Sequence, residues 1–155
     1  MSSSRLSADR VLVVSAALAD GTADTVTPGV SLLAEGGVIT RMWTGEDPGP
    51  PPAGVTVVDG TGATLVPGLV DSHAPAPTPG GGSLRANQLA WEVQALVEAG
   101  VAPRTAPAAV TWRGGDLLGI PEAGRLTVGG PAHFSLVHGD PLTDPAALWR
   151  VWLTR

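Results

Sequence analysis

The side chains best suited to bind a metal in this sequence are its three histidines, His73, His133 and His138. A catalytic zinc site usually takes three protein ligands, so all three, or carboxylates in their place, would have to meet. His133 and His138 are five residues apart, and on one strand an odd separation places two side chains on opposite faces. We therefore do not expect these two to share a metal, and we interpret His133 as an edge or turn residue.

The carboxylates suggest turns more than acid–base catalysis. Asp140 and Asp144 are four residues apart around Pro141, within a Gly-Asp-Pro turn sequence. Asp71 follows an apolar run, where it would accept hydrogen bonds at a strand end. The Gly80–Gly82 run lacks the lysine of a phosphate-binding loop, and no serine lies in a nucleophile-elbow pattern. These residues form no complete catalytic group.

The elements that would position these residues are mainly short strands. Apolar and β-branched runs predict strands over residues 10–17, 29–34, 38–44, 55–58 and 63–66. Glu35-Gly36-Gly37 supplies the turn of a hairpin. Further strands are predicted over residues 126–128, 133–138 and 149–154, with a short helical turn at 144–148 that Asp144 caps.

Between these two sets of strands the pattern is helical. From Leu84 to Trp112, apolar residues recur at three- and four-residue spacing, and Gly100 is a natural stop. A second helix over residues 102–111 requires Pro107 to lie in its first turn, since elsewhere it would break or kink the helix. The alternating Pro and Gly-Gly-Gly-Ser sequence before Leu84 predicts a linker.

Several strings, in this order, resemble the two ends of an amidohydrolase-superfamily chain. They are Gly29–Ile39, Val57–His73, Leu96–Pro103, Ala108–Thr111, Leu117–Gly119, Gly124–Leu126 and Gly139–Pro145. The resemblance extends over about residues 8–73 and 88–155. It implies a mainly β fold with a short helical segment, in which both chain ends form one β-sandwich-like composite domain.

The family's catalytic TIM barrel, about 250 residues in its typical form, would have to lie between His73 and Leu84. Only a Pro/Gly-rich linker is there, so we expect no complete barrel. The predicted organisation is an N-terminal part of the sandwich at 1–72, the linker at 73–84, a residual helical segment at 85–119, and the C-terminal part of the sandwich at 120–155.

The resemblance also implies which metal ligands are present and which are missing. The family binds zinc or another divalent metal, beginning with two histidines two residues apart on one strand. Here His73 stands at the first position and Pro75 at the second. The sequence has no lysine to form the family's bridging carbamate, and no cysteine for a thiolate site. We expect no catalytic or cofactor-binding residues, no bound cofactor, and His73 as a vestigial metal ligand.

Three functions follow as alternatives. By resemblance the chain is a hydrolase of carbon–nitrogen bonds other than peptide bonds, but the missing ligands predict an inactive protein. Otherwise it is a non-functional remnant, or an interaction module that self-associates or binds a related full-length protein through its helical segment. The net charge of −5 argues against nucleic acid. No apolar run reaches the ~20 residues that span a membrane, and the run 11–19 only loosely imitates a signal peptide, so we expect a cytoplasmic protein.

Overall fold

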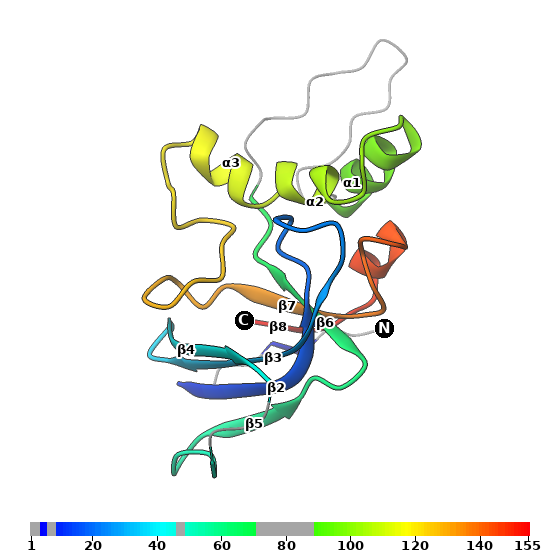
Figure 1. Ribbon diagram of the computed structural model, residues 1–155. Coiled ribbons are helices and arrows are strands. Elements are labelled where there is room, and N and C mark those ends of the chain that lie inside the picture. The colour runs from blue at the N-terminus through cyan, green and yellow to red at the C-terminus, as the bar shows by residue number, and fades with distance from the viewer. Residues whose placement is uncertain (1–3, 6–8, 46–48, 71–88) are drawn as a thin grey trace.

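A computed structural model describes residues 4–5, 9–45, 49–70 and 89–155. They form one mixed eight-stranded sheet with a layer of short helices at one end (Figure 1). The strands are β1 (Ser4–Arg5), β2 (Arg10–Leu18), β3 (Thr27–Glu35), β4 (Val38–Thr44), β5 (Thr56–Asp59), β6 (Ala63–Pro67), β7 (Phe134–His138) and β8 (Val151–Thr154). Their order is β1-β8-β7-β6-β2-β3-β4, with β5 also paired to β2.

Strand β2 lies at the point where the sheet changes direction. One of its edges pairs with β3, and the other pairs with β5 along its first half and with β6 along its second. Between the halves, Ser15 has a φ of 58°, which is uncommon for a residue other than glycine. Its N–H group donates to the Ser31 hydroxyl at 3.3 Å. The local turn of the backbone lets one strand serve two partners on the same edge.

The sheet curls until its far edge meets the segment that leads into β7. At the start of β4, Val38 forms an isolated bridge with Pro131, and the Ile39 N–H donates to the Gly130 carbonyl at 2.9 Å. The curled sheet encloses the main core. Its buried residues are Val11, Val13, Ala16, Val30, Leu32, Ala34, Ile39, Val58, Ala63, Leu65, Leu126, Ala132, Phe134, Leu136 and Leu153.

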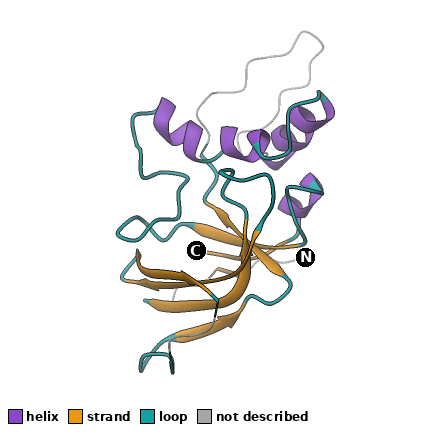
Figure 2. Ribbon diagram, in the orientation of Figure 1, coloured by secondary structure: helices purple, strands orange, loops and turns teal. Residues whose placement is uncertain are grey.

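The two halves of the chain join in this sheet. Strand β6, from the first half, pairs antiparallel with β7 along its whole length, and β1 pairs parallel with β8. The prediction of a mainly β domain built by both chain ends is therefore confirmed, and the described residues contain no barrel of the TIM type. The sandwich-like form arises from one curled sheet, as the orange strands in Figure 2 show.

The helices are α1 (Leu89–Glu98), α2 (Thr105–Ala109), α3 (Trp112–Leu117) and the 3-10 turn η1 (Pro145–Trp149). A second core attaches α1, α2 and η1 to β6 and β7. Its buried residues are Val66, Ala90, Val93, Ala106, Val110, Val137, Ala147 and Leu148. Helix α2 is shorter than the possible helix over residues 102–111, and Pro107 is its third residue, in the first turn, where its missing N–H removes no helical bond. The Asp144 carboxylate caps η1 by accepting from the Ala146 N–H, which confirms that prediction.

Some local predictions are wrong. Residues 126–128, predicted as a strand, belong to an irregular segment in which the Gly130 N–H donates to the Thr127 carbonyl. The apolar signal there came from Leu126, whose side chain reaches the main core from a loop. Trp149 ends η1 and does not begin a strand. The predicted linker at 73–84 lies outside the described residues.

The run that loosely imitates a signal peptide forms β2, and Val11 and Val13 are fully buried there. Within the described part of the chain, no helix is both long and apolar enough to cross a bilayer.

Candidate functional site

The histidines do not come together in the described part of the chain. His133 lies just before β7 and is exposed, with its backbone carbonyl accepting the Gly68 N–H at 2.9 Å. His138 ends β7, is exposed, and stacks on Trp152 with ring centroids 5.8 Å apart. His73, the predicted vestigial ligand, lies outside the described residues, as do Asp71 and Pro75. Among the described residues, no group of three or more His, Asp or Glu side chains could hold a metal.

Asp140 and Asp144 have structural roles. The Asp140 carboxylate accepts the Leu142 N–H at 2.8 Å, and its backbone carbonyl accepts the Asp144 N–H at 2.9 Å. Asp144 caps η1 and forms an ion pair with Arg150. The hydrogen bond from Arg150 holds the pKa of the Asp144 carboxyl below its ordinary value. These contacts confirm the interpretation of this segment as a turn.

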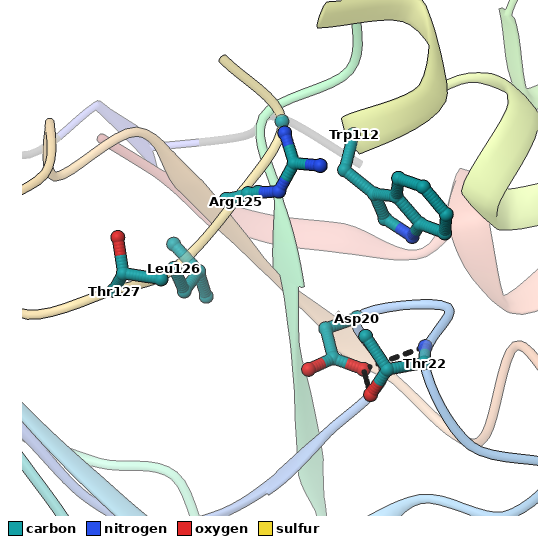
Figure 3. A pocket seen from close by; sticks show the side chains of 7 residues that line it. Asp20, Thr22, Trp112, Arg125, Leu126 and Thr127 are labelled. Atoms are coloured by element: carbon teal, nitrogen blue, oxygen red, sulfur yellow. Dashed lines mark hydrogen bonds between the residues drawn. The ribbon is translucent and has the colours of Figure 1, made fainter. Parts of the chain in front are cut away.

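A cavity that could receive a small molecule lies between the sheet and the helical layer (Figure 3). Its volume is about 310 Å³, at the lower end of the range for small-molecule sites. Three separate segments supply its walls: the loop after β2, the start of α3, and the irregular segment before β7. The lining residues are Asp20, Thr22, Trp112, Gly124, Arg125, Leu126 and Thr127.

Two glycines allow these segments to approach one another. Gly21 has a φ of +75°, and a Cβ there would lie 2.9 Å from the backbone Cα of Ala108 in α2. Gly124 has a φ of +69°, and a Cβ there would lie 2.3 Å from the backbone carbonyl carbon of Thr111. Since no real Cβ approaches backbone so closely, only glycine fits at either position. Both polar walls of the cavity thus depend on a neighbouring glycine.

One wall carries a carboxylate that the chain only partly satisfies. Asp20 Oδ1 accepts from the Thr22 N–H at 2.9 Å and from the Thr22 hydroxyl at 2.7 Å. Within the described part of the chain, Oδ2 has no hydrogen-bond donor and the side chain has no ion-pair partner. The turn fixes the carboxylate in position and leaves one oxygen available.

The opposite wall carries Arg125. Its Nη1 and Nη2 donate to the two carboxylate oxygens of Asp116 at 2.9 and 2.8 Å, and Nη1 also donates to the Pro121 carbonyl. This bidentate pair raises the pKa of Arg125 and lowers that of Asp116. The Nε–H and the second Nη2–H of Arg125 have no partner among the described residues. They form the side-on fork of the guanidinium, which can bind a second carboxylate.

Trp112 forms a third wall. The guanidinium carbons of Arg113 and Arg125 lie 5.1 and 5.2 Å from its ring centroid, at distances suited to cation–π attraction. Its Nε1 is buried and has no hydrogen-bond partner among the described residues. The indole is therefore held by packing and by the arginines, at the cost of one unsatisfied donor.

No pattern in the sequence indicated this cavity. Its residues come from positions 20–22, 112 and 124–127, and no local spacing links them. Gly21 and Gly124, each beside a charged residue, were the available signal, but glycine beside a charge is common in turns.

Comparisons with known proteins identify a related fold. No known protein family and no curated protein matches the sequence. A solved structure of a protein assigned as a prolidase from Bifidobacterium longum aligns with a TM-score of 0.78 at 11% identity, over 95% of this chain and 93% of that one. This chain is structurally similar to amidohydrolase-superfamily proteins. The resemblance stated from the sequence is thereby confirmed at the level of fold.

Two further solved structures align less closely. Molinate hydrolase aligns at 24% identity over 43% of this chain, with a TM-score of 0.37. An amidohydrolase aligns at 29% identity over 40% of this chain, with a TM-score of 0.34. In both cases this chain spans 14% of the other protein's length.

Proposed function

We propose that this chain is an amidohydrolase-family small domain that does not catalyse the family's metal-assisted hydrolysis of carbon–nitrogen bonds. The observation that carries the proposal is the direct junction of the two chain halves. Strand β6 pairs with β7, and the Val70 N–H, at the last described residue of the first half, donates to the Val110 carbonyl at 2.8 Å. The last described residue of the first half is thus bonded to the helical layer of the second half.

The interval between these halves is too short for a barrel. The described residues stop at Val70 and resume at Leu89, and the 18 residues between them must connect β6 to α1. A TIM barrel needs at least about 200 residues. The barrel strands are where the family's later metal ligands would lie, and the sequence has no lysine to bridge two metals. A metal that activates water for this type of hydrolysis would therefore lack protein ligands.

Metal content and hydrolysis, measured on the full chain of verified intact mass, test the proposal. We expect far less than one zinc, manganese or cobalt ion per chain after incubation with each metal and desalting. We also expect no hydrolysis of cyclic amides or N-acyl amino acids above a protein-free control. The proposal would be overturned by stoichiometric metal together with metal-dependent hydrolysis. Such hydrolysis would be abolished by a chelator and by His73→Ala, and retained in His133→Ala.

A second candidate function is an interaction module, and the exposed apolar residues near the helical layer favour it. Part of the helical face expected to need a partner is buried within the domain, since Val93 packs in the second core. Other large apolar side chains remain exposed, with Leu117 the most open at 75%. They are Leu69, Trp91, Leu117, Leu118, Ile120 and Trp149.

Such residues predict self-association or binding to a related full-length protein. Light scattering across a range of concentrations should show a mass above that of the monomer. The pair Leu117→Glu and Leu118→Glu should return it toward the monomer, because charge opposes burial of that surface. A clean monomer that binds no hydrophobic dye would contradict this function.

A further inference from the structure

We propose that the cavity between Asp20 and Arg125 binds a small zwitterion of the amino-acid type, with its ammonium group on Asp20 and its carboxylate on Arg125. Figure 3 shows these two side chains at opposite ends of the space, with Trp112 on one flank and Leu126 on the other. Opposite charges on opposite walls suit a molecule that carries both.

The carboxylate half of the ligand is matched by the free fork of Arg125. Asp116 occupies only the end-on fork formed by Nη1 and Nη2. The side-on fork, Nε–H with the second Nη2–H, presents two parallel donors at the spacing of two carboxylate oxygens. Asp116 also fixes the guanidinium, so the ligand does not have to order a flexible side chain.

The ammonium half is matched by Asp20. Thr22 occupies Oδ1 and orients the carboxylate, while Oδ2 keeps its acceptor capacity. The charged side chains that line the cavity, Asp20 and Arg125, are opposite in sign. A simple carboxylate anion would leave Asp20 without a cation, whereas a zwitterion pairs with both walls.

The uncharged part of the ligand is matched by the remaining walls. Leu126 is buried on the core side and the indole of Trp112 borders the other side, so an aliphatic side chain would contact apolar surface. The Thr127 hydroxyl, exposed at the rim, adds a donor and acceptor. Leucine is consequently the probe that we choose, because it combines both charges with an aliphatic side chain.

Isothermal titration of the full chain with L-leucine tests the proposal, and we expect saturable binding with a dissociation constant near or below about 1 mM. Three analogues separate the contributions: isoamylamine lacks the carboxylate, 4-methylpentanoate lacks the ammonium, and N-acetyl-L-leucine keeps the carboxylate but blocks the amine. Each should bind at least about tenfold more weakly, since each loses a hydrogen bond to a charged group.

Variants locate the site. Asp20→Asn and Arg125→Lys should each weaken leucine binding at least about tenfold, because one removes a charge and the other removes the fork. Asp24→Asn, in the same loop but outside the cavity and largely exposed, should bind leucine like the parent chain. Circular dichroism of each variant confirms that it is folded.

Three outcomes would overturn the proposal: no leucine binding at 20-fold above the ~1 mM expected, isoamylamine binding as tightly as leucine, or unchanged binding in a folded Asp20→Asn variant. None of these outcomes bears on metal content or hydrolysis, so they do not test the proposal that the domain lacks hydrolase activity.

Discussion

Replacing Phe134 with alanine tests whether the two chain halves form one cooperative unit. Phe134 is the only phenylalanine, is 1% exposed, and lies in β7 opposite Pro67 of β6. It therefore packs in the core at the seam between the halves. Truncating a fully buried phenylalanine costs about 3–5 kcal/mol. Since a typical domain is stable by about 5–15 kcal/mol, this loss is a large share of the total.

The assay is urea unfolding, followed by tryptophan fluorescence and by circular dichroism. We expect the two signals to coincide in one transition, with a lower midpoint for Phe134→Ala and an unchanged slope. Leu32→Ala, in β3 of the first half and also fully buried, should shift the same transition by about 2–5 kcal/mol. The control Val128→Ala changes a side chain that is 62% exposed and should stay within about 0.5 kcal/mol of the parent.

Independent halves would behave differently. If Phe134→Ala produced two transitions, with part of the tryptophan signal still changing at the parent midpoint, the sheet would not be the single unit that β6 and β7 create. A shift no larger than that of Val128→Ala would show that Phe134 does not lie in a close-packed core.

Three further predictions concern the cavity walls and the surface charges. Gly124→Ala should destabilise the domain by more than about 2 kcal/mol, since it adds a backbone clash to a left-handed φ. Gly119→Ala, at a position with a φ of +73° and open space around it, should cost only about 1–2 kcal/mol. Thermal melting compares the two variants, and equal losses would contradict the close approach of Gly124 to Thr111. Hydrogen bonds hold the pKa values of four carboxyl groups below their ordinary values in the folded state; the groups are Glu35, Asp59, Asp116 and Asp144. The stability that these carboxylates contribute is therefore present above the unfolded-state pKa and is lost as the pH falls through the folded-state pKa. Melting midpoints should drop between about pH 5 and pH 3, and Asp116→Asn should make that drop shallower; an identical acid profile for the variant would argue against the Arg125 pair. Trp112→Phe should leave stability within about 1 kcal/mol of the parent, because it removes an N–H that has no partner among the described residues. A larger loss would contradict this and would show that the indole contributes through its packing or through a bond from that nitrogen.

Much of the β architecture could be predicted from the sequence because it depends on local patterns. Strand β4 has the predicted bounds, and β2, β3 and β6 differ from the predicted bounds by three residues or fewer at any end. Alternating apolar residues and glycine turns fix such strands locally. The capping role of Asp144 was also predictable, since a carboxylate just before a turn depends only on its neighbours.

Other features could not be predicted because distant contacts decide them. Leu126 appeared to belong to a strand, but it is buried from a loop by contact with the curled sheet. The double pairing of β2 depends on where Ser15 turns the backbone, and no residue pattern marks that position. The cavity needs Gly21 against α2 and Gly124 against Thr111, contacts that join positions about 87 and 13 residues apart.

The sequence by itself determined the β character of the domain, the family it resembles, and the shortage of metal ligands, because strand patterns, turn residues and residue types are local properties. The resemblance also implied that the two chain ends form one domain. Only the tertiary structure decided that they do so in a single curled sheet, and that Asp20 and Arg125 occupy opposite walls of one cavity. The physical reason is that side-chain burial and charge placement depend on which distant segments meet, and those meetings arise from packing of the whole chain.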